Sequence, residues 1–154
     1  MKSYVYFDMD GVLCDWVESF KRNCDIDLEV FQSLSKEEKF KIKETLFGYE
    51  FFRSMKPIEK GLDLFRTTKI GTDNIFILSA VGDSSHVDEI KRAKTEWIRE
   101  HICKEIEILF VDKVENKYTK MVPSGDDVLH VLVDDREKAI DSWNAHGGFG
   151  VLFY

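Results

Sequence analysis

Residues 4–13 read YVYFDMDGVL, and this stretch decides how the rest of the chain is arranged. Its apolar first part, residues 4–7, is typical of a strand and is followed by two carboxylates two positions apart, Asp8 and Asp10, and by Gly11. Because side chains alternate along a strand, we expect Asp8 and Asp10 on the same side just beyond its carboxyl end. Ligands bind at that end of the strands in an open α/β sheet. Taken alone, the stretch fits an acidic turn as well as a binding site, because Asp and Gly are common turn residues.

The composition indicates a folded chain that does not bind long nucleic acid. With 154 residues, of which 44% are hydrophobic and 33% charged, the chain has the size of one domain with a buried core. Its 22 basic and 29 acidic side chains give a formal charge of -7, whereas proteins that bind long nucleic acid present basic surfaces. A small anionic substrate is still compatible with this charge, because a metal ion reverses the local field inside a pocket.

The cysteines and histidines show no disulfide or zinc pattern. The three cysteines are odd in number and lack a C-x-x-C spacing, which favours a reducing compartment, and the four histidines are scattered. The first strand pattern begins close to the amino terminus, which leaves no room for a signal peptide, and no apolar run reaches the length of a membrane span. We therefore expect a cytoplasmic protein with no membrane partner. The sequence leaves its oligomeric state open.

Patterns typical of strands and helices alternate along the chain. Apolar runs predict strands at residues 4–7, 74–78, 106–111, 128–133 and 151–153. Amphipathic spacing and capping residues predict helices at about 15–23, 35–47, 58–69, 85–101 and 136–146. Strands that alternate with helices predict an α/β fold with a Rossmann-like parallel sheet, right-handed crossovers and helices on both faces. We expect a single domain over residues 1–154.

The interval between the first two predicted strands is longer than a simple crossover needs. Its pattern is helical, and residues 15–52 contain eight aromatic side chains. We therefore expect a small helical cap at residues 15–52, inserted after the first strand, with a return helix near 58–69.

Chemically useful groups also follow two of the other predicted strands. Ser79 ends the second strand, and Asp134 and Asp135 end the fourth. Because the carboxyl ends of parallel strands lie at one edge, these groups are expected to meet Asp8 and Asp10. Four carboxylates at one edge repel one another unless a cation neutralises them, and hard oxygen ligands indicate Mg²⁺. A hydroxyl followed by backbone amides suits a phosphoryl group, so the set predicts phosphoryl transfer through a carboxylate nucleophile.

The motifs resemble the haloacid dehalogenase (HAD) superfamily of phosphohydrolases over nearly the whole chain. The D-x-D-G-V-L pattern at residues 8–13, ILSA at 77–80 and VLVDDR at 131–136 agree with this superfamily in order and in strand context. The resemblance implies a HAD-like fold and a hydrolytic mechanism that passes through an aspartyl-phosphate.

Three longer segments are similar, more narrowly, to the 5'(3')-deoxyribonucleotidase group. They are FDMDGVLCDW at residues 7–16, FFRSMKPIEKG at 51–61 and KTEWIREH at 94–101. The similarity implies an Mg²⁺-dependent phosphomonoesterase acting on nucleoside monophosphates, deoxyribonucleotides above all, with a 5' or a 3' phosphate. The base and sugar preference stays open.

The superfamily resemblance implies a role for each acidic residue. Asp8 would be the nucleophile and a magnesium ligand. Asp10 would protonate the leaving oxygen and then deprotonate the attacking water, and its backbone carbonyl would reach the metal. Asp134 would be a further magnesium ligand, and Asp135 would share that role or support the ligands by hydrogen bonds.

The resemblance also implies phosphate-binding groups. Ser79 and Ala80 would hold phosphate oxygens. A lysine would offset the charge of the nucleophile and the phosphate, and the KTEWIREH stretch favours Lys94 for this role, with Lys117 as the alternative because it precedes the fourth strand. Taken singly, each of these residues also fits an ordinary cap or a solvated helix face.

The cap aromatics are simplest to explain as the core of the cap itself. Trp16 is the exception, because it stands where the similar nucleotidases place an aromatic ring that stacks on the base. Phe20, Tyr49 and Phe52 are lesser candidates for the same contact.

Three other functions remain open at this point. A polynucleotide 3'-phosphatase shares the motifs and the D-D-R sequence at residues 134–136, but the acidic composition disfavours it. A phosphatase of small sugar or amino-acid phosphates would carry the same groups. A non-catalytic phosphate-binding domain is disfavoured, because binding alone does not require both Asp8 and Asp10.

Overall fold

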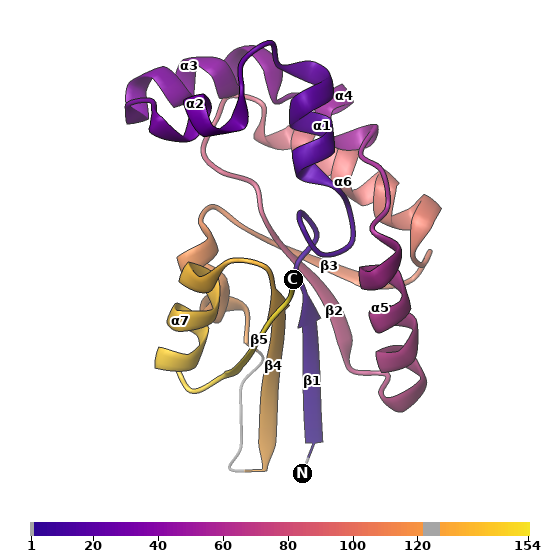
Figure 1. The fold of residues 1–154 in the computed structure, drawn as a ribbon. Coiled ribbons are helices and arrows are strands. Elements are labelled where there is room, and N and C mark those ends of the chain that lie inside the picture. The colour runs from indigo at the N-terminus through magenta and orange to yellow at the C-terminus, as the bar shows by residue number, and fades with distance from the viewer. Residues whose placement is uncertain (1, 122–126) are drawn as a thin grey trace.

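The computed structural model describes residues 2–121 and 127–154 and contains one five-stranded parallel sheet (Figure 1). The strands are β1 (Lys2–Phe7), β2 (Ile75–Ala80), β3 (Glu107–Val111), β4 (Val128–Asp134) and β5 (Phe149–Leu152). Their order in the sheet is β3-β2-β1-β4-β5, and every neighbouring pair is parallel. The predicted α/β fold with a parallel sheet is therefore confirmed.

The strand order places β1 at the point where the direction of the sheet reverses. The chain adds β2 and β3 on one side of β1 and then returns to add β4 and β5 on the other. In open α/β sheets a crevice forms at such a reversal, outside the carboxyl ends of the strands. The ends of β1 and β4 are therefore where a ligand is expected.

Helices cover both faces of the sheet, so alternate side chains of β1 are buried on opposite sides. The core helices are α5 (Glu59–Gly71), α6 (Val87–His101) and α7 (Glu137–Ala145), and a 3₁₀ segment, η1 (Val114–Lys120), precedes β4. Phe7 packs edge-on against Phe65 of α5 at 5.3 Å between ring centroids, whereas Tyr6 packs against Trp143 of α7 at 5.1 Å. A strand buried on both faces accounts for the continuous apolar run that marks β1 in the sequence.

Four further helices lie beyond the carboxyl end of β1 (Figure 1). They are α1 (Trp16–Asn23), α2 (Leu28–Ser33), α3 (Lys36–Leu46) and α4 (Tyr49–Arg53). As the spacing predicts, Asp15 caps α1 by accepting the Glu18 amide at 3.0 Å, and Ser35 caps α3 by accepting the Glu38 amide at 3.2 Å. Their buried aromatic residues, including Phe20, belong to the same apolar cluster as the buried side chains of β1 and α5.

The structure differs from the sequence-based expectation in its shortest elements. The helices α2 and α4 and the segment η1 have five to seven residues each and were not predicted. The strand β5 begins at Phe149, two residues before the predicted start. Helices this short are not stable from local propensity and depend on tertiary packing, which a local pattern does not reveal. Among the described residues, no helix has both the length and the apolar character that a membrane span requires.

Candidate active site

The turn after β1 is fixed by its own backbone hydrogen bonds. The carbonyl of Met9 accepts the amides of Leu13 at 2.9 Å and Cys14 at 3.1 Å, which closes a tight turn directly after the strand. Gly11 has φ of 86°, a conformation that residues with a side chain rarely adopt. A Cβ at this position would also lie 2.1 Å from Oδ2 of Asp135. Gly11 therefore turns the chain and leaves space for the Asp135 carboxylate.

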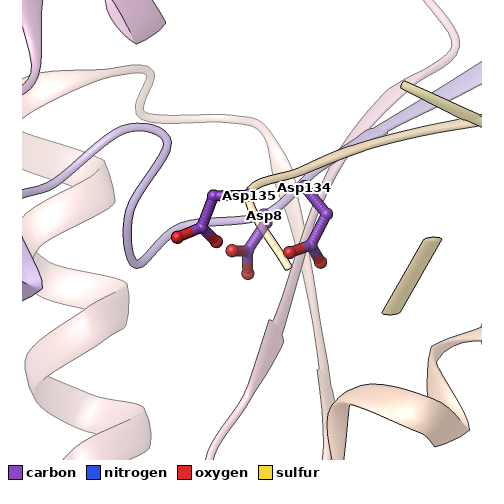
Figure 2. A group of neighbouring side chains, drawn as sticks. All are labelled: Asp8, Asp134 and Asp135. Carbon is purple, nitrogen blue, oxygen red and sulfur yellow. The ribbon is translucent and has the colours of Figure 1, made fainter. Parts of the chain in front are cut away.

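Three of the predicted metal ligands meet at the ends of β1 and β4. One carboxylate oxygen from each of Asp8, Asp134 and Asp135 lies within 4.8 Å of the other two (Figure 2). Burial, followed by the nearby Asp134 carboxylate, raises the pKa of Asp8 well above the usual aspartate range. Asp135 keeps an exposed surface, but its carboxylate lies against Gly11, and burial followed by Asp134 raises its pKa to about 6. A nearby cation therefore favours the ionised forms of Asp8 and Asp135.

The donor set of this cluster fits magnesium. Mg²⁺ binds to a few carboxylate oxygens and completes its coordination with water and substrate oxygens. Asp10 is expected to reach the metal through its backbone carbonyl, and its carboxylate lies outside the cluster, with Oδ2 2.9 Å from Nζ of Lys94. The described side chains therefore assemble Asp8, Asp134 and Asp135 as the candidate metal ligands.

Lys117 lies directly against the predicted nucleophile. Its Nζ donates to Oδ1 of Asp8 and to Oδ2 of Asp134, both at 2.7 Å, and the side chain is almost fully buried. Burial disfavours the ammonium form, but the two carboxylates outweigh this effect and the pKa of Lys117 is raised. These contacts use two of the three N–H donors that a lysine offers. Lys117 therefore stays charged beside Asp8.

Lys94 occupies a different position, between Asp10 and the end of β2. Its fully buried Nζ donates to Oδ2 of Asp10 at 2.9 Å, to Oγ of Ser79 at 2.8 Å and to the carbonyl of Ala80 at 3.0 Å. All three donors of the ammonium group are thus used within the protein. The sequence favoured Lys94 as the lysine beside the nucleophile, but the geometry places Lys117 there and leaves Lys94 to connect Asp10 with Ser79.

The segment η1 brings Lys117 into the site. The hydroxyl of Ser142 in α7 donates to the carbonyl of Glu115 at 2.6 Å, and the rings of Tyr118 and His146 stack at 3.5 Å between centroids. Within the segment, Asn116 donates to the carboxylate of Asp112 at 2.9 Å. These contacts hold η1 against α7, so that Lys117 faces the ends of β1 and β4. The two contacts with α7 join residues far apart in the sequence, which is why the sequence gave only a weak signal for Lys117.

The predicted base-contacting residues lie within the cap. Trp16 is partly exposed and stacks on Phe20 at 5.4 Å between ring centroids. Phe20 has no exposed surface, so it offers none to a substrate. The hydroxyl of Tyr49 donates to Glu96 of α6, and its ring lies 4.4 Å from the guanidinium of Arg92. Among these candidates, Trp16 alone combines a partly exposed ring with the absence of a side-chain hydrogen bond to the residues that the structure describes.

One neighbour of Asp10 had no place in the sequence-based prediction. The thiol of Cys14 lies 3.5 Å from Oδ1 of Asp10 and 3.4 Å from the carbonyl of Met9. Burial, followed by the Asp10 charge, raises the pKa of Cys14, so the sulfur stays a thiol and can donate to Asp10. The tight turn places Cys14 beside Asp10, and only the turn geometry reveals this contact.

Comparison with solved structures identifies the architecture. A crystal structure of a dehalogenase aligns with 99% of this chain and 84% of its own, with a TM-score of 0.61 and 12% sequence identity. The fold is HAD-like. A hydrolase from Streptococcus pneumoniae TIGR4 aligns with 100% of this chain and 94% of its own at 17% identity. Its TM-score of 0.47 is too low to support a structural inference.

Sequence comparisons add nothing to this result. No family model matches the chain, and no curated protein matches it significantly. At 12% identity the likeness to the dehalogenase establishes the fold alone. The narrower similarity to deoxyribonucleotidases has no support among these comparisons.

Proposed function

We propose that this protein is a magnesium-dependent phosphomonoesterase that uses Asp8 as its nucleophile. The observation that carries the proposal is the convergence of Asp8, Asp134 and Asp135 within 4.8 Å, with the Lys117 ammonium bound to two of them. Such a site suits a substrate that is itself an anion with several oxygens. A phosphoryl group has oxygens to offer a cation and an ammonium, whereas a carbon–halogen bond has none. The HAD-like fold of the dehalogenase accordingly supports a hydrolase, and the charge distribution favours phosphate as the group transferred.

The residues of the site supply each step of a two-stage hydrolysis. A carboxylate oxygen of Asp8 attacks phosphorus and the bond to the leaving oxygen breaks, while Asp10 gives that oxygen a proton. Asp10 then takes a proton from water, which attacks the phosphoryl group on Asp8 and releases inorganic phosphate. Lys117 is hydrogen-bonded to the nucleophile. Lys94 is hydrogen-bonded to both Asp10 and Ser79 and so fixes their positions relative to each other. Mg²⁺ bound to Asp8, Asp134 and Asp135 would neutralise the negative charge of the phosphoryl group.

Nucleoside monophosphates are the substrate class we propose. The support comes from the segments at residues 7–16, 51–61 and 94–101 and from the free surface of the Trp16 ring, on which a base can stack. The net charge of -7 favours a small substrate over long nucleic acid. Polynucleotide 3' ends and small-metabolite phosphates remain the competing classes.

A substrate panel tests this proposal. Thymidine 5'- and 3'-monophosphate, an oligonucleotide with a 3'-phosphate, a sugar phosphate and p-nitrophenyl phosphate are assayed with Mg²⁺ and with a chelator. We expect hydrolysis of the nucleoside monophosphates that requires Mg²⁺ and disappears in Asp8→Asn. Asp25→Asn, at an exposed aspartate outside the site, is the matched control and keeps wild-type activity. Faster hydrolysis of the oligonucleotide or the sugar phosphate would reassign the substrate class.

A further inference from the structure

The thiol of Cys14 has two candidate acceptors, and the turn after β1 decides between them. Its Sγ lies 3.4 Å from the carbonyl of Met9 and 3.5 Å from Oδ1 of Asp10. The Met9 carbonyl already accepts the amides of Leu13 at 2.9 Å and Cys14 at 3.1 Å, which occupy both of its lone pairs. A carboxylate also accepts a stronger hydrogen bond than a carbonyl, because it is charged. The thiol hydrogen is therefore directed to Asp10.

The two oxygens of the Asp10 carboxylate have different partners. Oδ2 accepts a charge-assisted hydrogen bond from the Lys94 ammonium at 2.9 Å. For Oδ1, the Cys14 thiol is the one hydrogen-bond donor among the residues that the structure describes. A thiol is a weak donor. Oδ1 is therefore the oxygen that stays available to take up and release a proton, whereas Oδ2 is committed to Lys94.

A single contact does not fix the direction of the Asp10 carboxylate. Its side chain is 24% exposed, so packing alone does not hold it, and the hydrogen bond at Oδ2 still allows the group to rotate. A second contact at Oδ1 removes this freedom. The orientation matters because proton transfer requires the two oxygens to be aligned within hydrogen-bond distance.

Cys14 is itself held firmly by the fold. Its side chain has no exposed surface. The residues on either side of it are bonded to the segment that precedes α5. The Ile58 amide donates to the Leu13 carbonyl at 2.9 Å, and the Asp15 amide donates to the Lys56 carbonyl at 2.8 Å. The sulfur is thus placed by the backbone on both sides and gives Oδ1 of Asp10 a fixed partner.

We propose that Cys14 is a positioning residue for Asp10, whose thiol holds Oδ1 in place as the atom that exchanges the proton. In the first step Oδ1 gives its proton to the leaving oxygen as the bond from that oxygen to phosphorus breaks. In the second step Oδ1 takes a proton from the attacking water. The thiol keeps its own hydrogen throughout. This inference rests on the proposed phosphomonoesterase activity.

The test compares thymidine 5'-monophosphate with p-nitrophenyl phosphate by kcat/KM, which reports the step in which the leaving oxygen departs. Cys14→Ala removes the donor, so kcat/KM should fall about fivefold more for the monophosphate, whose poor leaving group needs the proton. Cys14→Ser keeps a donor at the same position and should restore most of this loss. Cys24→Ala, at the other buried cysteine, is the matched control and keeps the wild-type kcat/KM for both substrates.

The infrared S–H stretching band of Cys14 tests the contact independently of activity. The band is isolated as the difference between the spectra of wild type and Cys14→Ala, in which the thiols of Cys24 and Cys103 cancel. We expect the band to move to higher frequency when Asp10→Asn is introduced into both proteins, because a neutral amide accepts a weaker hydrogen bond than a carboxylate.

Two results would overturn the positioning role while leaving the phosphomonoesterase in place. They are a loss of kcat/KM in Cys14→Ala that is equal for the two substrates or absent from both, and a Cys14→Ser variant as impaired as Cys14→Ala. If the wild type hydrolyses neither substrate with Mg²⁺, the proposed function fails instead. The infrared band then decides on the contact alone: a shift in Asp10→Asn supports it, and an unchanged band rejects it.

Discussion

Gly11 affects both the turn after β1 and the space available at the candidate metal site. Its φ of 86° suits glycine, and its missing side chain leaves the space in which the Asp135 carboxylate lies. A residue with a Cβ would have to displace that carboxylate or move the turn. The DMDG motif at residues 8–11 therefore supplies two aspartates at the end of β1. Its glycine also leaves room for the carboxylate of Asp135, the residue after β4.

Gly11→Ala tests this double role against Gly147→Ala. Both positions have positive φ, and each alanine should cost about 1 kcal/mol of stability from backbone strain. Of the two, only Gly11 has a neighbour in the way, since no described heavy atom beyond the adjacent residues lies within 4 Å of a Cβ at Gly147. We expect both variants to melt at lower temperature but only Gly11→Ala to need more Mg²⁺ for half-maximal activity. An equal Mg²⁺ requirement in the two variants would contradict the role given to Asp135.

The two buried lysines differ in which carboxylate they contact. Lys117 binds Asp8 and Asp134, whereas Lys94 binds Asp10 and Ser79. If Asp10 protonates the leaving oxygen, Lys94→Met should slow hydrolysis most for substrates with poor leaving groups. We expect its kcat to fall at least about tenfold more for an alkyl phosphate than for p-nitrophenyl phosphate, because a good leaving group needs little proton donation.

Lys117→Met provides the comparison for this prediction. It removes the cation beside the nucleophile, so it should lower kcat for both substrates by a similar factor. The measurement is kcat for a series of phosphate esters with graded leaving-group pKa, on folded protein checked by circular dichroism. The same leaving-group dependence in both variants would contradict the separate roles of the two lysines.

Among the helices and strands, the long ones could be predicted from the sequence, whereas the short ones could not. The strand β1 and the helix α6 have strong apolar patterns and formed where the patterns predict them. The segment η1 has no such pattern and is held by contacts with α7, from Ser142 to Glu115 and from His146 to Tyr118. For this reason the sequence could name Lys117 only as an alternative.

Ser142→Ala tests whether α7 positions η1 and its lysine. The variant loses the 2.6 Å hydrogen bond to the Glu115 carbonyl, at a cost of about 1 kcal/mol. We expect kcat to fall several-fold because Lys117 is less well held beside Asp8. Ser33→Ala loses a comparable bond, to the Val30 carbonyl at 2.7 Å, on the exposed surface of the cap and should keep the wild-type kcat. If both variants keep wild-type kcat, α7 does not control the position of Lys117.

At the scale of the whole molecule, the acidic site should make stability depend on pH and metal together. The pKa of Asp135 is raised from 3.8 to about 6, so the folded state binds its proton more tightly than the unfolded state. The stabilising effect of that proton is complete below pH 3.8 and is lost as the pH rises through about 6. A bound Mg²⁺ keeps the carboxylates ionised and should remove this loss.

The measurement is the difference in unfolding free energy between wild type and Asp135→Asn, from pH 4 to 7, with a chelator. We expect the wild type to lose stability relative to the variant as the pH rises, because only the wild type gains a negative charge at position 135, beside Asp134. Added Mg²⁺ should reverse the order at pH 7, since the wild type keeps all three ligands. A difference independent of pH would show that Asp135 does not repel its neighbours.

The parallel sheet and the meeting of Asp8 with Asp134 were predictable, because alternating strands and helices predict parallel strands whose carboxyl ends lie at one edge. The partners of each lysine and the contact between Cys14 and Asp10 were not. Each of these depends on how a loop or short helix packs against a distant element. The sequence thus indicated the chemistry of the site better than its specificity.

Trapping of the phosphorylated enzyme tests the central claim most directly. Folded wild-type protein is mixed with Mg²⁺ and thymidine 5'-monophosphate, quenched in acid within milliseconds, and its peptides are mapped by mass spectrometry. We expect one phosphoryl group on the peptide that contains Asp8, which hydroxylamine removes and which is absent from Asp8→Asn. Steady turnover of the monophosphate with no phosphoryl group on Asp8, or turnover that survives in Asp8→Asn, would contradict it.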